Sequence, residues 1–220
     1  YVYNSYDNLR TRMQAVRYFV AFRVYKAAEA IFGTVTCCSG CSSAYRRSAA
    51  LEVLSLWENQ TFLNTRCTYG DDRSLTNYIL KKGYLALFAP DAVSATVVPN
   101  TWQQFFRQQL RWKKSWTRES LIALTFMWKR HPLMFVSYVS SVALPLMAPL
   151  IVVRAMIWVP VTSNVPPYFY LIGLVIMSAL YGVYYRMFRH DGLWLYAICF
   201  AWFYSLVLVW QLPYAVITLR

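Results

Sequence analysis

The five residues from Gln108 to Trp112 combine side chains that suit a phosphate group and a sugar. On a helix, Gln108, Arg111 and Trp112 share one face, because side chains three and four residues apart stack along the axis. The planar guanidinium of Arg111 can bind two phosphate oxygens at once, and the indole of Trp112 can stack on the apolar face of a sugar ring. The same residues would also suit a basic helix that simply anchors among lipid headgroups. The run is therefore a candidate binding site with a structural alternative.

Two adjacent carboxylates, Asp71 and Asp72, follow Gly70 at the expected start of a helix that runs through Lys82. A carboxylate in this position can act as a general base that takes the proton from an attacking hydroxyl. It can equally cap the helix, since aspartate is favoured at the N-cap and by the helix dipole. The pair is a candidate catalytic site, and helix capping is the alternative.

Three cysteines, Cys37, Cys38 and Cys41, lie in one short segment, and the last two have the CxxC spacing of zinc and redox sites. A structural zinc site needs four ligands, whereas the chain adds only Cys67, Cys199 and two histidines beside apolar stretches. A disulfide is disfavoured in a cytoplasmic setting. We therefore expect a tight turn lined by small side chains, and no metal ligands within this chain.

The elements that would position these residues follow from apolar spacing and turn residues. Helices are expected over 13–31, 51–57, 71–82 and 102–129, the last with a break near Thr117, and short strands over 34–38, 84–89 and 96–98. Gly33 and Gly83 are expected to end the first and third of these helices. This mixture predicts an α/β fold for residues 1–100, followed by amphipathic interface helices over 101–131.

The C-terminal part of the chain is apolar enough to lie in a membrane. Only 14% of all residues are charged, against about 25% in a typical soluble domain, and 58% are hydrophobic. Three stretches, 133–159, 168–188 and 193–219, each exceed the roughly 20 residues that cross a bilayer core. Residues 132–220 are therefore expected to form a membrane region with two or three helices. Pro213 interrupts the third stretch, so this stretch either spans the membrane or lies at its interface.

The charge distribution predicts the orientation in the membrane. Basic residues flank the apolar stretches at 129–131 and 186–190, whereas the 160–167 loop carries no charge. The positive-inside rule then places residues 1–130 in the cytoplasm. The net charge of +13 would also suit nucleic acid, but the basic residues crowd beside apolar stretches, which a membrane surface explains better. No nucleic-acid partner is expected.

Together these motifs resemble those of the processive, membrane-embedded, inverting glycosyltransferases of family 2, and most closely the class I hyaluronan synthases. The matching stretches lie in the same order, at 37–46, 59–80 and 108–112, where the last reads QxxRW. Cys41 stands where that family usually has proline. Because the chain starts at Tyr1 without Met and stops at Arg220, we expect a fragment: the C-terminal, acceptor half of a GT-A-like α/β domain with part of the membrane region, inactive alone.

The resemblance implies a role for each matching residue. Asp72, with Asp71 beside it, matches the general base that deprotonates the acceptor hydroxyl. Arg111 and Gln108 match residues near the donor diphosphate, and Trp112 matches the residue on which the acceptor sugar stacks. The acceptor end of the site would be formed by Cys67, Ser39, Gly40, Tyr45 and Arg46.

The resemblance also implies partners and a location. The donors would be UDP-sugars, most closely UDP-N-acetylglucosamine and UDP-glucuronate, and the product would be hyaluronan, exported across the lipid bilayer. Mg²⁺ or Mn²⁺ would be required, with ligands expected upstream of this chain. The protein would be an integral protein of the plasma membrane with its catalytic part in the cytoplasm. The alternatives are a chitin or poly-N-acetylglucosamine synthase, an enzyme that adds one or a few sugars to a lipid, and a non-enzymatic membrane anchor or channel subunit.

Overall fold

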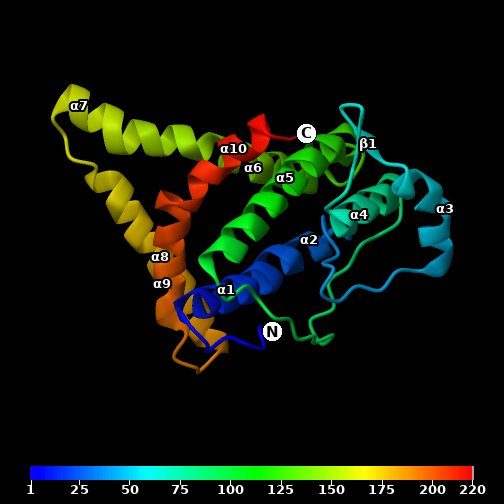
Figure 1. The fold of residues 1–220 in the computed structure, drawn as a ribbon, viewed down its shortest axis with the longest axis horizontal. Helices are drawn as coiled ribbons and strands as arrows, with labels where there is room; N and C mark the ends of the chain where they lie inside the picture. The colour runs from blue at the N-terminus through cyan, green and yellow to red at the C-terminus, as the bar shows by residue number, and fades with distance from the viewer. Residues whose placement is uncertain (220) are drawn as a thin grey trace.

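The computed structural model describes residues 1–219 of the 220-residue chain, and most of them are helical. The helices are α1 (Leu9–Val20), α2 (Ala27–Ile31), α3 (Arg47–Glu58), α4 (Asp71–Lys81), α5 (Trp102–Met127), α6 (Pro132–Val153), α7 (Val159–Ser163), α8 (Tyr168–Phe188), α9 (Trp194–Leu206) and α10 (Gln211–Ile217). π-helical turns over Ala21–Lys26 and Arg154–Trp158 join α1 to α2 and α6 to α7, and a 3₁₀ turn over Leu208–Trp210 precedes α10. Figure 1 shows α5 crossing the middle of the molecule, with α3 and α4 on one side and α8 and α9 on the other.

Sheet structure is sparse among the described residues, so the predicted α/β fold is not evident here. Strand β1 (Thr61–Phe62) pairs antiparallel with β2 (Thr65–Arg66). The three predicted strands contribute only two isolated parallel bridges, Thr34↔Ala86 and Val2↔Thr96. The first predicted strand stops early because the following segment turns toward α4, to which the backbone N–H groups of residues 38 and 40 donate hydrogen bonds.

The first predicted helix forms as α1, a π turn and α2. It begins at Leu9 rather than Met13, because Asn8 caps it: the side-chain oxygen of Asn8 accepts the N–H groups of Arg10 and Thr11 at 3.0 and 3.1 Å. Gly33, with φ +63°, follows its end, as predicted.

Helix α4 begins at Asp71, and Gly70 occupies its N-cap position. The prediction that Asp71 or Asp72 caps this helix is therefore wrong. Both carboxylates lie in its first turn, where the helix dipole still favours them. Gly70 has φ +83°, and a Cβ built on it would overlap the Ser115 hydroxyl of α5. The close approach of the two helices therefore excludes a capping aspartate at position 70.

Helix α5 runs without a break, so the predicted interruption near Thr117 is wrong. The Thr117 hydroxyl donates to the carbonyl oxygen of Lys113 one turn earlier, at 2.8 Å, and the residue is buried, so tertiary packing outweighs its low helix propensity. Thr101 caps α5 by accepting the N–H of Gln104. One hydrophobic core joins α5 to α4 and α6, with Leu80, Phe126 and Tyr138 among its buried residues.

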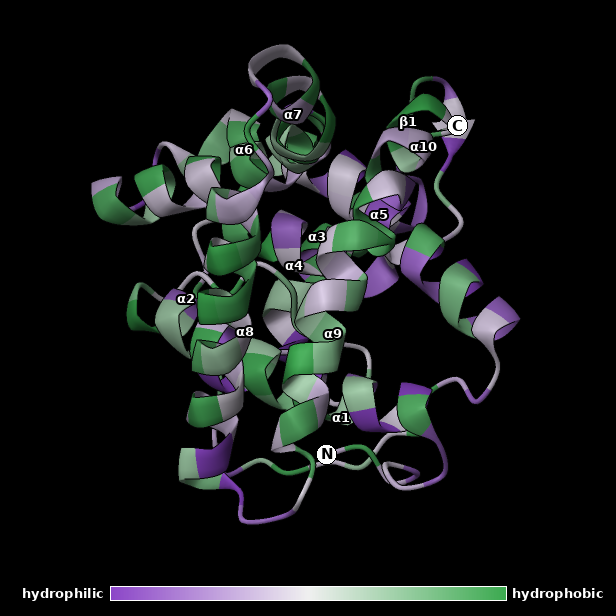
Figure 2. Cartoon of the chain, turned by 90° about the vertical axis from the view of Figure 1, so that its left-hand side faces the viewer, coloured by the Kyte–Doolittle hydropathy of each residue, from purple (hydrophilic) through white to green (hydrophobic). Residues whose placement is uncertain are grey.

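Two helical stretches are long and apolar enough to cross a membrane, Pro132–Ser163 and Tyr168–Phe188. Figure 2 shows hydrophobic residues over most of α8 and α9, and hydrophilic residues in the loop between them. Large apolar side chains point outward from these stretches; Phe169, for example, is 87% exposed. Such a surface fits hydrocarbon rather than water. The structure therefore agrees with the predicted membrane helices in length and composition.

The third apolar stretch is bent. Helices α9 and α10, with the 3₁₀ turn before α10, meet at 44°, so they form either a broken span or a re-entrant segment. Helix α9 packs on α8 and α1, whereas α10 packs on α5. Figure 1 shows α10 returning to the end of α5 near the C-terminus.

We expect Gly70→Ala to lower the free energy of unfolding of the full-length protein by more than about 2 kcal/mol, because the new methyl group would overlap Ser115 and alanine disfavours a positive φ. The matched control is Gly83→Ala. Gly83 has φ +99°, but its new methyl group would meet no atom within 4 Å, so only the backbone penalty of about 1–2 kcal/mol applies. Thermal and denaturant unfolding would measure both. Equal losses would contradict a close contact between α4 and α5.

Candidate active site

The carboxylate of Asp72 is held at the start of α4 by hydrogen bonds from two segments. Its Oδ2 accepts the backbone N–H of Gly40 at 3.2 Å and the thiol of Cys37 at 3.7 Å. Its Oδ1 accepts the N–H of Arg73 at 2.8 Å. The side chain is only partly buried, so the carboxylate is oriented by its donors and still accessible. The donors favour the ionised form of the carboxylate and fix its position, so it is available to accept a proton.

Thr76 fastens the segment around Gly40 to α4. Its hydroxyl accepts the N–H of Cys38 at 3.0 Å and donates to the backbone oxygen of Asp72 at 2.7 Å. No role was predicted for Thr76 from the sequence. Its position one helical turn after Asp72 could have indicated that its hydroxyl lies near the candidate base.

Cys37 is a second residue whose role was not predicted. Burial raises the pKa of its thiol, and the charge of Asp72 raises it further against the opposing effect of Arg73. The thiol therefore stays protonated at neutral pH and can donate to the carboxylate. The cysteines of this segment are all free.

The other residues predicted near the acceptor end fall into two groups. Gly40 contacts Asp72, and Ser39 lies beside it in the same turn. Cys67 joins the hairpin instead, where its N–H donates to Gln60 at 3.0 Å, and burial raises the pKa of its thiol. Arg46 is exposed at the N-cap position of α3.

Two other predicted site residues, Asp71 and Tyr45, form no side-chain hydrogen bond with Asp72 among residues 1–219. Asp71 is exposed, and its backbone oxygen accepts the indole N–H of Trp57 at 3.1 Å. Tyr45 is partly buried, and burial raises the pKa of its hydroxyl.

The QxxRW face of α5 meets α1. Trp112 is partly buried, with its ring 6.0 Å from that of Tyr18 and 5.4 Å from the guanidinium carbon of Arg17. Arg111 is exposed, and Gln108 is partly buried. Arg111 is therefore free to meet a ligand, whereas Trp112 is positioned by α1.

The sequence missed Gln109 and Arg17, which hold this contact. Gln109 is 1% exposed and accepts an N–H of Arg17 at 2.6 Å. An amphipathic pattern that puts one glutamine of a Gln-Gln pair on the buried face could have identified Gln109. Nothing in the sequence spacing pairs it with Arg17, because the two residues are 92 positions apart.

A buried polar network fixes α5 against α4. Glu119, 1% exposed, accepts hydrogen bonds from Gln60 at 3.0 Å and Asn77 at 2.9 Å, and it forms an ion pair with Arg118 at 2.8 Å. Arg118 also donates to the backbone oxygen of Tyr69 at 2.6 Å, just before Gly70. Every partner is polar and paired, as a buried ion pair requires.

A cavity of about 560 Å³ links the two halves of the candidate site. Cys37 and Ser39 line it on one side and Tyr18 on another. Asp72 and Trp112 do not line it themselves, but each contacts a lining residue, Cys37 and Tyr18 respectively. The candidate base and the candidate sugar platform therefore flank one cavity.

The described residues do not fit a divalent cation. Residues 1–219 contain no group of three or more His, Cys, Asp or Glu side chains that could hold a metal ion. None of the roles assigned to residues of this chain depends on a metal.

Lys113, one position after Trp112, lies against α9 and the turn that follows it. Its ammonium donates to the carbonyl oxygen of Leu208 and lies 5.5 Å from the ring centroid of Tyr204. Burial, with a smaller contribution from the charge of Arg17, lowers the pKa of Lys113 from 10.5 to about 8.

We therefore expect ¹³C-methylated Lys113 in the full-length protein to titrate near pH 8, and Lys113→Met to identify the signal by its loss. The unfolded chain binds more protons between pH 8 and 10.5, so the contribution of Lys113 to stability rises with pH across this window. The Tm of wild type should therefore rise relative to that of Lys113→Met as the pH increases from 8 to 10.5. A titration near 10.5 would contradict the burial of this ammonium group.

Comparisons with known proteins identify the family to which the chain belongs. The sequence profile described as chitin synthase matches residues 1–213. An N-acetylglucosaminyltransferase of Rhizobium meliloti (strain 1021) is 36% identical over 74% of this chain and 38% of its own length. Hyaluronan synthase 3 of Gallus gallus is 38% identical over 59% of this chain and 23% of its own length, and hyaluronan synthase 1 of Xenopus tropicalis is 31% identical over 100% and 37%.

The chain thus spans less than two fifths of the length of each of these relatives. The profile match nevertheless covers all the motifs described above, from the Cys37 segment to the QxxRW face of α5. The chain belongs to the chitin synthase family of glycosyltransferases.

Proposed function

We propose that the full-length protein is a processive, inverting glycosyltransferase that polymerises UDP-sugars, with hyaluronan as the product that fits best. The observation that carries this proposal is the position of Asp72. Its carboxylate is held by Cys37 and Gly40 beside the cavity that Tyr18 and Trp112 approach from α1 and α5. Relatives named hyaluronan synthase and N-acetylglucosaminyltransferase support the same chemistry.

Asp72 would act as the general base. It would take the proton of the acceptor hydroxyl while that oxygen attacks the anomeric carbon of the donor sugar from the side opposite UDP. The bond between the anomeric carbon and the diphosphate oxygen would break, and UDP would leave with the electron pair. Exposed Arg111, with Gln108, would bind the diphosphate, and Trp112 would stack on the acceptor sugar. Cys67, Ser39, Gly40, Tyr45 and Arg46 would form the acceptor end.

Each of the three parts of the chain would have a different role in synthesis and export. Residues 1–100 would complete a cytosolic α/β domain, residues 101–131 would lie at the membrane interface, and residues 132–220 would form part of a channel for polymer export. We propose that α9 and α10 are re-entrant, because α10 packs on α5, an interface helix in this account. The protein would reside in the plasma membrane with its catalytic part in the cytoplasm. A required Mg²⁺ or Mn²⁺ would take its ligands from outside this chain.

A chitin-like or poly-N-acetylglucosamine synthase is the second candidate. The observation that favours it is the 36% identity to a rhizobial N-acetylglucosaminyltransferase over 74% of this chain. Asp72 would still act as the general base and Trp112 would still stack on the acceptor sugar, but the acceptor polymer would be neutral.

Asp72→Asn in the full-length protein is expected to lower kcat for sugar transfer by about 10²–10⁴-fold, because the amide cannot accept the proton. UDP release from membranes measures this loss. Asp71→Asn should cost far less, since its exposed carboxylate, unlike that of Asp72, accepts no hydrogen bond from the Cys37 segment in residues 1–219, and Asp91→Asn in an exposed loop is the control. Full activity of Asp72→Asn, with an unchanged Tm, would favour a non-enzymatic anchor or channel subunit.

Cys37→Ala is expected to lower kcat by about tenfold while the KM for donor stays constant, because the Asp72 carboxylate loses one of the two donors that hold its Oδ2 in place. Cys37→Ser keeps a donor and should restore most of the activity. If serine and alanine are equally impaired, then the volume of the thiol matters and its hydrogen bond to Asp72 does not.

A further inference from the structure

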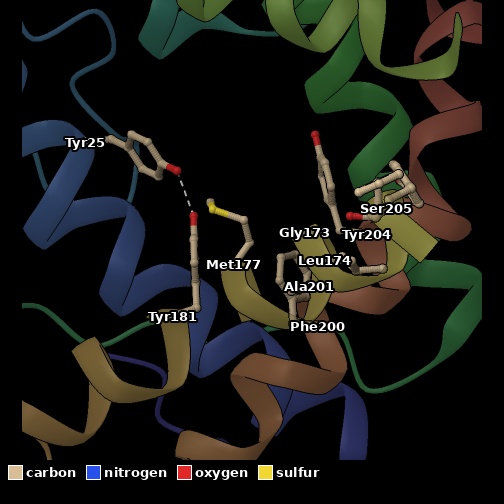
Figure 3. Close-up of a pocket in the computed structure, with 11 residues that line it drawn as sticks. Tyr25, Gly173, Leu174, Met177, Tyr181, Phe200, Ala201, Tyr204 and Ser205 are labelled. Carbon is tan, nitrogen blue, oxygen red and sulfur yellow. Dashed lines mark hydrogen bonds between the residues drawn. The ribbon is translucent and has the colours of Figure 1, made fainter. Parts of the chain in front are cut away.

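A second cavity, of about 500 Å³, lies between α8, α9 and the π turn after α1. Figure 3 shows Tyr25 and Tyr181 on one side, with their hydroxyls 2.7 Å apart, and Tyr204 and Ser205 on the other. Much of the remaining wall is apolar, with Met177 projecting between the two sides. Hydroxyls set among aromatic and apolar walls are suited to sugar rings, which have polar edges and apolar faces.

Two cations lie between this cavity and Trp112. The guanidinium carbon of Arg17 is 5.5 Å from the ring centroid of Phe200 and 5.4 Å from that of Trp112. The ammonium nitrogen of Lys113 is 5.5 Å from the ring centroid of Tyr204. Phe200 and Tyr204 both line the cavity. Arg17 and Lys113 are therefore placed where a chain passing from Trp112 into the cavity would meet them.

Neither cation has an acidic partner within residues 1–219. Arg17 donates to the neutral amide of Gln109, and Lys113 donates to a backbone carbonyl. Helices α8, α9 and α10 contain no aspartate or glutamate. The only glutamate of α5, Glu119, is already paired with Arg118. Burial lowers the pKa of Arg17 as well as that of Lys113, as expected for cations without an acidic partner nearby.

We propose that Arg17 and Lys113 bind the carboxylates of an acidic polysaccharide as it passes from Trp112 into the tyrosine-lined cavity. This inference rests on the proposed function and deepens it, because a neutral polymer would leave both cations uncompensated. Two partly buried positive charges attract a uronic-acid carboxylate strongly in a site of low dielectric constant. The pair therefore favours an acidic product over chitin. An anionic lipid headgroup offers the same negative charge, so the experiment separates the two.

The test uses the full-length protein in nanodiscs of neutral phosphatidylcholine, with fluorescent hyaluronan and chitin oligosaccharides of equal length as probes. Lys113→Met should weaken hyaluronan binding about tenfold and reduce its salt dependence, while chitin binding stays constant. Lys113→Arg should restore hyaluronan binding. Lys114→Met, which removes a charge from the next position of α5, is the matched control and should bind like wild type.

Three results would overturn the inference. Equal effects of Lys113→Met on both oligosaccharides, or no effect on either, would exclude recognition of the carboxylate. Displacement of hyaluronan from wild type by phosphatidylglycerol, but not from Lys113→Met, would assign the cations to a lipid. Sugar transfer measured in parallel separates the two proposals, because transfer without charge-selective binding contradicts this inference alone.

Discussion

The buried carboxylate of Glu119 is the interaction on which the arrangement of the site depends. It gathers Gln60 before the hairpin, Asn77 of α4 and Arg118 of α5 into one network, and Arg118 extends this network to the residue before Gly70. A buried carboxylate without these donors would be strongly destabilising, so the three segments must meet in this one arrangement. Gly70 allows α4 to start in contact with α5. The first turn of α4, which carries Asp72, is thereby fixed relative to the QxxRW face.

Two basic residues of α5 differ in their partners among residues 1–219: one is paired with an acidic group, and the other has neutral partners only. Arg118 is compensated by an adjacent carboxylate and a backbone carbonyl, and it supports the fold. Lys113 and, on α1, Arg17 have only neutral partners, and each lies near an aromatic ring that lines the tyrosine-lined cavity. A protein that leaves two charges uncompensated in a partly buried place loses stability there, and such losses are common where a ligand binds. Along α5, about one and a half helical turns separate Arg118, which supports the fold, from Lys113, which we propose to recognise a ligand.

Local signals in the sequence predicted what depends on neighbouring residues. Gly33 and Gly83 end their helices as expected, and the apolar lengths located both candidate membrane helices. Several errors arose where distant segments decide the outcome. Ser115 of α5 makes Gly70 the N-cap residue, and the attachment of the Cys37 segment to Thr76 shortens a predicted strand to one bridge. The hairpin of β1 and β2 was missed because its turn uses Leu63 and Asn64 at positive φ, and leucine seldom adopts this conformation. The assignment of further residues to the site around Asp72 is a proposal, and the geometry supports it.

The most direct test of the central claim is UDP release by membranes that contain the full-length protein, supplied with UDP-N-acetylglucosamine, with UDP-glucuronate, or with both. The account predicts sustained release only when both donors are present, and a product that hyaluronidase degrades. Sustained release with UDP-N-acetylglucosamine alone would contradict the acidic product and the role of Arg17 and Lys113, while leaving Asp72 and Trp112 as the transfer site. No release under any of these conditions would contradict the proposed synthase.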